Sequence, residues 1–182
     1  MMRSVDSWLV VPAIIIPGLI ASPVFAVQYM TAEQAQKLLF PGADQFSVQT
    51  LSLNAAQMKA VEVASGVLVR ASEMNVSRAS QAGVLSGWVL FDQVYGKHEL
   101  INYAVAIGVD GAVKGVEILE YREARGNEVN NAKWRAQFIG KTSGNPVRLE
   151  QDIKNISGAT LSCQHVTDGV RRLLATYVVA LR

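Results

Sequence analysis

The stretch from Ile101 to Tyr121 constrains the fold of this chain more than any other. Over residues 101–109, apolar residues alternate with small ones such as Ala104 and Ala106, the period of two that is typical of a β-strand. Asp110-Gly111 follows, a pair that favours the positive φ angles of a two-residue turn, and residues 113–121 return as an antiparallel partner. We therefore expect a β-hairpin within an antiparallel sheet, with another element packed closely on its small residues.

Two short helices are expected before the sheet. Thr31 with Gln34, and Asn54 with Gln57, have the spacing of a capping box, in which side chain and backbone bond reciprocally at a helix start. Pro41-Gly42 ends the first helix and Gly66 the second. Further strands are expected at residues 67–71 and 87–92, with a loop between them.

A long amphipathic helix is expected at the end of the chain, starting near Ser162 and packing on the sheet. His165, Arg171 and Arg172 lie off its apolar stripe and are expected at the surface. The chain is therefore predicted to be α+β, an antiparallel sheet with a central hairpin, packed against a long C-terminal helix and shorter N-terminal helices. The stripe consists of Val166, Val170, Leu173, Leu174, Tyr177, Val178 and Leu181.

The first 26 residues have the layout of a signal peptide. Arg3 precedes an apolar run, and Val24-Phe25-Ala26 places small residues where signal peptidase reads them. Retention as a membrane anchor is the alternative, although three prolines interrupt the run. Three regions follow from this layout: a signal peptide or anchor at 1–26, a mostly helical region at 27–83, and a domain at 84–182.

Charge and ligand-type residues exclude several classes of function. The 17 Lys and Arg residues against 15 Asp and Glu residues give a net charge of +2, so no nucleic-acid partner is expected. The chain has two histidines and one cysteine, Cys163, so neither a metal site nor an internal disulfide is expected. Cys163 is expected to be a small buried residue of the last helix.

Ser157-Gly158-Ala159-Thr160 precedes that helix, and it resembles the S/T-G-A-T attachment motif of the FMN-binding domain family. This family includes the flavinylated subunits of the Rnf and sodium-translocating NADH:quinone reductase complexes. The resemblance extends to the spacing of Trp134, Phe138, Gly140 and Lys141, which is similar to the W…F-x-G-K segment of the family. On periodicity alone, Trp134 and Phe138 form the apolar face of a short helix.

The resemblance implies FMN joined covalently to Thr160 through a phosphoester, with a flavin transferase needed for maturation. Small residues at Gly158 and Ala159 would let a transferase grasp the peptide, and a helix beginning at Leu161 or Ser162 would direct its positive dipole end at the phosphate. Ser157 and Ser162 are expected to add hydroxyl donors. Glu123 falls where the family often has the Glu of an E-T-P-G-L-G stretch, which matches here only in part.

One position departs from the family pattern. Members usually carry Asp six residues before the modified threonine, whereas this chain has Lys154 there. Asp152, two residues earlier, is the candidate to supply the acid in a shifted frame.

By resemblance, the chain is expected to be an exported electron-transfer flavoprotein without catalytic residues of its own. It would act in the periplasm or at the outer face of the cytoplasmic membrane, beside a membrane redox partner of the quinone reductase or cytochrome type. Two alternatives remain open: a non-flavinylated envelope interaction or ligand-binding module, and a hydrolase that uses Ser157 or Ser162 with His165 and Asp168.

Overall fold

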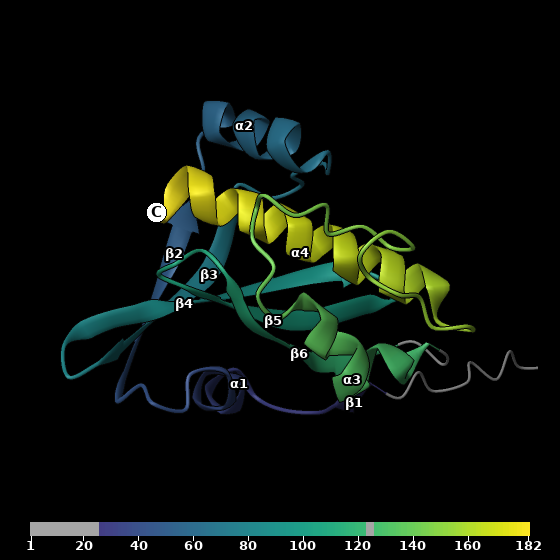
Figure 1. Ribbon diagram of the computed structural model, residues 1–182, viewed down its shortest axis with the longest axis horizontal. Helices are drawn as coiled ribbons and strands as arrows, with labels where there is room; N and C mark the ends of the chain where they lie inside the picture. Colours follow the sequence, from purple (N-terminus) through teal and green to yellow (C-terminus); the bar gives the residue numbers. More distant parts are fainter. Residues whose placement is uncertain (1–25, 123–125) are drawn as a thin grey trace, which may run out of the picture.

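A six-stranded antiparallel sheet forms the centre of the protein, seen in a computed structural model that describes residues 26–122 and 126–182 (Figure 1). The strand order is β1-β6-β5-β4-β3-β2, so every neighbouring pair except β1 and β6 is consecutive in the chain. The strands are β1 (Val27–Gln28), β2 (Gln45–Ser52), β3 (Glu73–Gln81), β4 (Val84–Tyr95), β5 (Leu100–Gly108) and β6 (Val113–Tyr121).

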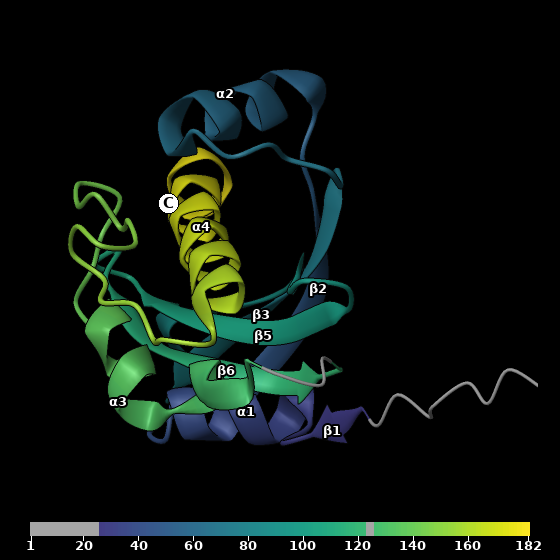
Figure 2. The ribbon, with the colours of Figure 1, turned by 90° about the vertical axis from the view of Figure 1, so that its right-hand side faces the viewer.

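Helices cover both faces of this sheet, which gives the layers seen in Figures 1 and 2. Helix α1 lies on one face and α4 on the other, while α2 packs on the side of α4 that points away from the sheet. The helices are α1 (Ala32–Leu39), α2 (Ala55–Ser65), α3 (Ala132–Arg135) and α4 (Thr160–Ala180), with short 3-10 turns η1 (Asn127–Asn130) and η2 (Ala136–Phe138) beside α3.

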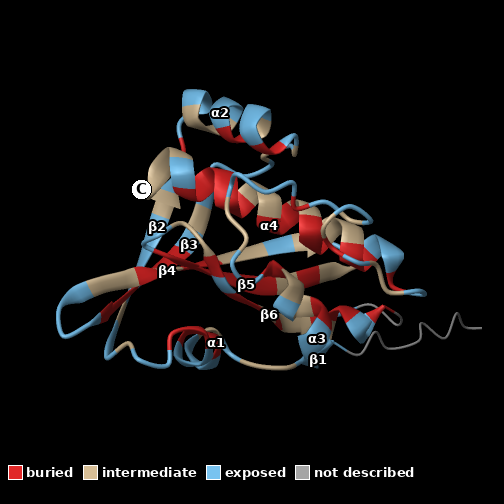
Figure 3. Ribbon diagram, in the orientation of Figure 1, coloured by how far each residue is buried: buried red, intermediate tan, exposed pale blue. Residues whose placement is uncertain are grey.

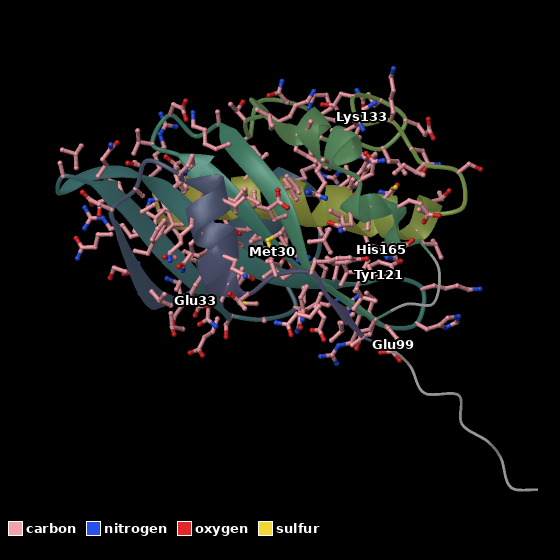
Figure 4. All side chains as sticks on the ribbon, turned by 90° about the horizontal axis from the view of Figure 1, so that it is seen from below. Met30, Glu33, Glu99, Tyr121, Lys133 and His165 are labelled. Atoms are coloured by element: carbon pink, nitrogen blue, oxygen red, sulfur yellow. The ribbon has the colours of Figure 1, made fainter. Side chains whose placement is uncertain are left out.

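Helix α1 can approach its face of the sheet because the residues below it are small. Ala104 and Ala106 of β5 are fully buried in one cluster with Ala35 of α1, as the alternation of small residues predicts. Figure 4, seen from below, shows α1 lying across the strands, with Glu33 on it and Met30 just before it. This face therefore holds a small second core.

The main core lies between α4 and the other face of the sheet. Val166, Val170 and Leu173 of the helix are fully buried against strand residues such as Val105 and Ile107. Figure 3 shows buried residues along α4 and in the strands beneath it. The predicted helix, its apolar stripe and its packing on the sheet are confirmed, with the exception of Val178, which is 41% exposed.

The predicted hairpin is confirmed as β5 and β6, but its turn is longer than predicted. Only Gly111 has a positive φ, at +77°, and its N–H donates to the carbonyl of Gly108. Asp110 instead uses its carboxylate to accept from the N–H of Ala112. The turn therefore contains three residues rather than two, as in a type I turn followed by a left-handed residue.

Both predicted capping boxes are present. Thr31 and Gln34 exchange side-chain and backbone hydrogen bonds at the start of α1, and Asn54 and Gln57 do so at the start of α2. Helix α2 ends at Gly66, as predicted. In these cases the local sequence alone satisfies the first free N–H groups of the helix.

The region 27–83 is predicted to be mostly helical, but the structure shows that it is not. It contributes β1, β2 and β3 as well as two helices, and β3 pairs with β4 across the expected boundary at residue 84. The strand predicted at 67–71 is wrong, since that segment is irregular and the strand begins at Glu73. The sequence did not indicate β3 because many of its residues are polar or small. Both faces of this strand are partly covered, so even Ser77 and Ser80 are buried.

Arg171 and Arg172 are not on a solvated face, contrary to prediction. Only 13% and 15% of their side chains are exposed. Arg171 donates to the carbonyls of Ser65 and Val147, while Arg172 donates to the Asp92 carboxylate at 2.6 Å. These two residues fasten α4 to the elements around it.

The signal peptide prediction falls almost wholly on residues 1–25, which lie outside the described residues. Among the helices of residues 26–122 and 126–182, none is long and apolar enough to span a membrane. In the same ranges no cluster of three or more His, Cys, Asp or Glu residues could hold a metal ion.

Gly169 is expected to be indispensable where α4 crosses β5. A Cβ there would lie 2.0 Å from the Tyr103 hydroxyl oxygen and 2.9 Å from its ring. Gly169→Ala should therefore lower the free energy of unfolding by about 1–3 kcal/mol through overpacking, although alanine ordinarily stabilises a helix relative to glycine. Urea denaturation measures this, with Gly144→Ala, whose Cβ has no contact closer than 3.6 Å, as the control. A Gly169→Ala variant as stable as the wild type would contradict the packing.

Candidate functional site

Thr160 is the first residue of α4, and its side chain is exposed. The Asn155 amide nitrogen donates to its hydroxyl oxygen at 3.0 Å. The orientation of that amide is set by its other atom, since Asn155 Oδ1 accepts from the N–H of Ile156 at 2.8 Å. The Thr160 hydroxyl oxygen thus accepts one hydrogen bond, and its own proton remains available for transfer.

The helix begins without a side-chain cap. Ala159 is the N-cap residue and offers no polar side chain, unlike the caps of α1 and α2. Gly158, at φ +88°, bends the chain into the helix, and the Ala159 N–H is used by the Ile156 carbonyl. The first amides of α4 therefore point out beside Thr160 with the positive end of the helix dipole.

Ser162 faces inward, away from Thr160. It is 4% exposed, and its hydroxyl lies 2.9 Å from the hydroxyl of Tyr121 at the end of β6. Gly126 packs against this pair, because a Cβ there would lie 2.6 Å from the Tyr121 hydroxyl and 2.9 Å from Ser162 Oγ. This contact places Gly126 next to the start of α4.

Trp134 and Phe138 form a small aromatic anchor beside the site. Both are buried, and their rings meet edge to face with centroids 5.2 Å apart. The Trp134 indole N–H donates to the carbonyl of Lys154 at 2.7 Å, and Gln137 accepts from the N–H of the same residue. The segment leading to Thr160 is therefore fixed on α3 and η2.

Lys141 and Asp152 anchor the other end of that segment. The Lys141 ammonium lies 3.0 Å from Asp152, whose oxygens also accept from the N–H groups of Val147 and Arg148. Asp152 is thus a structural residue of a tight loop, so the prediction that it supplies an acid to Thr160 is wrong. Lys154 is exposed, and it is Asn155 that contacts the threonine.

A hollow of about 520 Å³ opens between α3 and this segment. Trp134, Ile156 and Asn155 line it, so it reaches the residue that holds the Thr160 hydroxyl. Lys133 and Lys154 stand at its edge beside Glu128. It offers an aromatic wall and cationic side chains next to Thr160.

The residues of the alternative hydrolase site do not assemble. His165 Nδ1 contacts the carbonyl oxygen of Tyr95 at 2.5 Å, and Asp168 pairs with Gln164 and Arg171. The Ser162 hydroxyl is hydrogen-bonded to Tyr121, so none of these hydrogen bonds joins a serine to a histidine. Cys163 is fully buried as predicted, and burial raises the pKa of its thiol, which disfavours a reactive thiolate.

An exposed threonine at an uncapped helix start, held by an amide and flanked by an aromatic hollow, defines a small α+β domain that can carry a phosphorylated ligand. Residues 96–175 match the model of the FMN-binding domain. This match assigns residues 96–175 to the FMN-binding domain family.

Comparison with solved structures supports the same fold. NqrC of Shewanella oneidensis is similar with a TM-score of 0.50 and 18% sequence identity, over 80% of this chain and 82% of that chain. No curated protein matches this chain.

The structure groups some of the predicted site residues and separates others. Ser157, Gly158, Ala159 and Thr160 form the loop into α4, but Ser162 is buried beneath it. Glu123 lies outside the described residues. Asn155, Tyr121 and Gly126 also belong to the site and were not predicted from the sequence. Only Asn155 could have been suspected, because it directly follows Lys154.

The Asp152 loop should make stability depend on pH. Burial alone would raise the pKa of Asp152, but the N–H of Arg148, the Lys141 ammonium and the N–H of Val147 together lower it. Its contribution is therefore present above the unfolded pKa, near 4, and is lost as the pH falls through the lower folded value. Asp152→Asn should lower the free energy of unfolding by about 1–3 kcal/mol at pH 7, and by less as the pH falls to about 3.

Urea denaturation at several pH values measures this effect. Asp110→Asn is the control, because Asp110 also pairs with a lysine but is 56% exposed, so its loss should cost less than about 1 kcal/mol. Equal effects of the two substitutions, or a cost at Asp152 that does not change with pH, would contradict the role assigned to this loop.

Proposed function

We propose that this protein is an exported electron-transfer flavoprotein that carries FMN covalently on Thr160. The observation that carries the proposal is the exposed Thr160 hydroxyl, oriented by Asn155 at the uncapped start of α4, within the segment that matches the FMN-binding domain. FMN supplies one- and two-electron redox chemistry, and the protein supplies its position and environment.

The residues around Thr160 fit a phosphate ester. As a bond forms between Thr160 Oγ1 and the FMN phosphorus, the pyrophosphate bond of the flavin dinucleotide substrate breaks and its nucleoside monophosphate leaves, while the hydroxyl proton passes to a base that the transferase supplies. The phosphodiester that results keeps about one negative charge, which the first amides of α4 and its dipole stabilise. Lys154 and Lys133 add positive charge at the adjoining hollow.

The hollow beside α3 suits a flat aromatic group. Trp134 is held rigidly by its bond to the Lys154 carbonyl and by Phe138, so it can wall a ring without rearranging. The close contact of Gly126 with Tyr121 and Ser162 holds the chain on the other side near the attachment residue. Both features would help to orient a tethered group.

A flavin transferase is the maturation partner that this proposal requires. Its flavin nucleotide substrate would donate the FMN phosphoryl group to Thr160 and release the remaining nucleotide. The exposed Ser157, Gly158 and Thr160 are accessible to such an enzyme. Covalent attachment also suits an exported protein, because a dissociable cofactor would be lost where its free concentration is low.

The electron partners are proposed to be components of a membrane redox system, of the quinone reductase or cytochrome type. The resemblance to subunits of such complexes and the fold shared with NqrC support this role. The layout of residues 1–26 supports a location in the periplasm or at the outer face of the cytoplasmic membrane.

A second candidate is a module that is not flavinylated and serves in interaction or ligand binding. The observation favouring it is that Lys154 occupies the position of the family acid, while the residue that contacts the Thr160 hydroxyl is the donating amide of Asn155, which cannot accept the threonine proton. The same experiment separates the two candidates.

Coexpression with a flavin transferase should give a protein whose intact mass exceeds that of the polypeptide by FMN less one water. Thr160→Ala should abolish this adduct, because no other residue of the loop has a hydroxyl group that Asn155 orients. Ser157→Ala is the matched control and should keep the adduct. An unmodified wild-type protein would favour the second candidate, and an adduct that persists in Thr160→Ala would place the flavin elsewhere.

Asn155→Ala should slow attachment without preventing it. Loss of one hydrogen bond that orients the hydroxyl costs about 1 kcal/mol, so the initial rate of adduct formation should fall about fivefold. Mass spectrometry over a time course measures this rate with purified transferase. Asn75→Ala, which removes an exposed amide on β3, is the control. Equal rates for the two variants would show that Asn155 has no role in attachment.

A further inference from the structure

A second cavity, of about 1010 Å³, lies apart from the Thr160 site. It is open to solvent on one side and is lined by α4, by the segment of residues 66–74, by the ends of β4 and β5, and, across the sheet, by α1 residues such as Glu33 and Gln36. None of the residues that line it falls between 120 and 164, so it shares no residue with the attachment loop or with the hollow beside α3.

The cavity exists because the sheet splits. β3 pairs with β4 only as far as Val76, which lies opposite Leu90. β3 nevertheless continues beside β2 to Glu73, and β4 continues beside β5 to Tyr95. The two halves of the sheet separate, and β2 and β3 rise toward α2 (Figures 1 and 2). A space of this size within a split sheet is a built feature of the backbone.

Large apolar side chains are left exposed around this cavity. Leu68, Tyr95 and Val48 line it and are 57%, 62% and 63% exposed. Val67-Leu68-Val69 is the run that the sequence analysis predicted as a strand, yet it belongs to no strand of the sheet. Exposed apolar residues gathered around a cavity favour a ligand with an apolar body.

Arg172 gives the cavity a polar end. Its Nη2 donates to Asp92, whose same oxygen also accepts from the Tyr103 hydroxyl. Among the described residues, Ser77 Oγ is the only buried side-chain nitrogen or oxygen without a partner. The remaining N–H groups of Arg172 are therefore not sealed in the core, and since Arg172 lines the cavity they are available to an oxygen acceptor there.

We propose that this cavity binds a small amphipathic molecule. Its apolar body lies against residues 67–69 and Tyr95, and its carbonyl or carboxylate oxygen accepts from Arg172. The volume is at the upper end of the range for small-molecule sites, which suits an elongated body. Asp92 remains paired with Arg172, and Glu33, Glu73 and Asp168 also line the cavity, so the site does not require an anionic ligand.

Fluorescence of 1-anilinonaphthalene-8-sulfonate on the full chain tests the proposal, with displacement by decanoate and by 2-undecanone. Saturable displacement at one site is expected. Leu68→Asp should weaken binding of both competitors at least fivefold. Val63→Asp is the matched control, since Val63 is a 74% exposed apolar residue of α2 outside the cavity, and should change binding less than twofold. Non-saturable binding, or equal effects of the two substitutions, would overturn the proposal.

Arg172→Met tests the polar end and should weaken the oxygen-bearing competitors about tenfold. If this variant does not fold, Tyr95→Ser, which changes an exposed side chain, should still weaken both. Unchanged binding in Tyr95→Ser and Leu68→Asp would overturn the site. If decanoate binds more tightly than 2-undecanone, the ligand is a carboxylate. If 2-undecanone binds at least as tightly as decanoate, the ligand is a neutral carbonyl compound. Either result supports the proposal.

Thr160→Ala separates this site from the flavin. Because the two sites share no residue, binding in the cavity should be the same in Thr160→Ala as in the wild type. A missing flavin adduct would therefore leave this proposal intact, and a missing cavity ligand would leave the flavin proposal intact. Loss of cavity binding in Thr160→Ala would overturn the separation.

Discussion

The close packing of α4 on the sheet is the constraint on which the rest of the structure depends. The helix lies so near β5 that Gly169 leaves no space for a side chain above Tyr103. Tyr103 donates to Asp92, and the same carboxylate accepts from Arg172, so one hydrogen-bonded group of three residues fixes the depth and rotation of the helix. Burial and the adjacent Asp92 carboxylate raise the pKa of Tyr103 well above its usual value, which keeps it a neutral donor. Because Thr160 is the first residue of this helix, its position follows from the packing of the core.

The segment before α4 is positioned by a different set of contacts. Residues 139–159 contain no helix or strand. The ion pair between Lys141 and Asp152 holds this segment together. The Lys154 carbonyl accepts from Trp134 and the Lys154 N–H donates to Gln137, which fixes the segment on α3 and η2. These contacts give Trp134 and Lys141 structural roles. They support the loop that leads to Thr160.

Local patterns predicted local structure well. The capping boxes of α1 and α2, the β5–β6 hairpin and the apolar stripe of α4 each depend on residues close in sequence, and each was found. β2 and β3 were missed because their burial is set by partners far along the chain, which makes serines acceptable inside a sheet. The pairing of Arg171 and Arg172 was missed for the same reason, since Val147 and Asp92 reach them only through tertiary structure. At the candidate site, the sequence placed Thr160 at the start of the last helix, but it gave no sign that Asn155 contacts the threonine hydroxyl.

The boundaries of the sequence family differ from those of the sheet. The match begins at residue 96, just after β4, yet β4 covers one whole edge of β5 and contributes Asp92 to the group that orients α4. A chain reduced to the matched segment would turn β5 into an edge strand with unpaired backbone groups and would leave Arg172 without its carboxylate. The cooperative folding unit is therefore larger than the recognisable one. Homologous chains can diverge freely in the residues of the preceding strands only while they keep strands there.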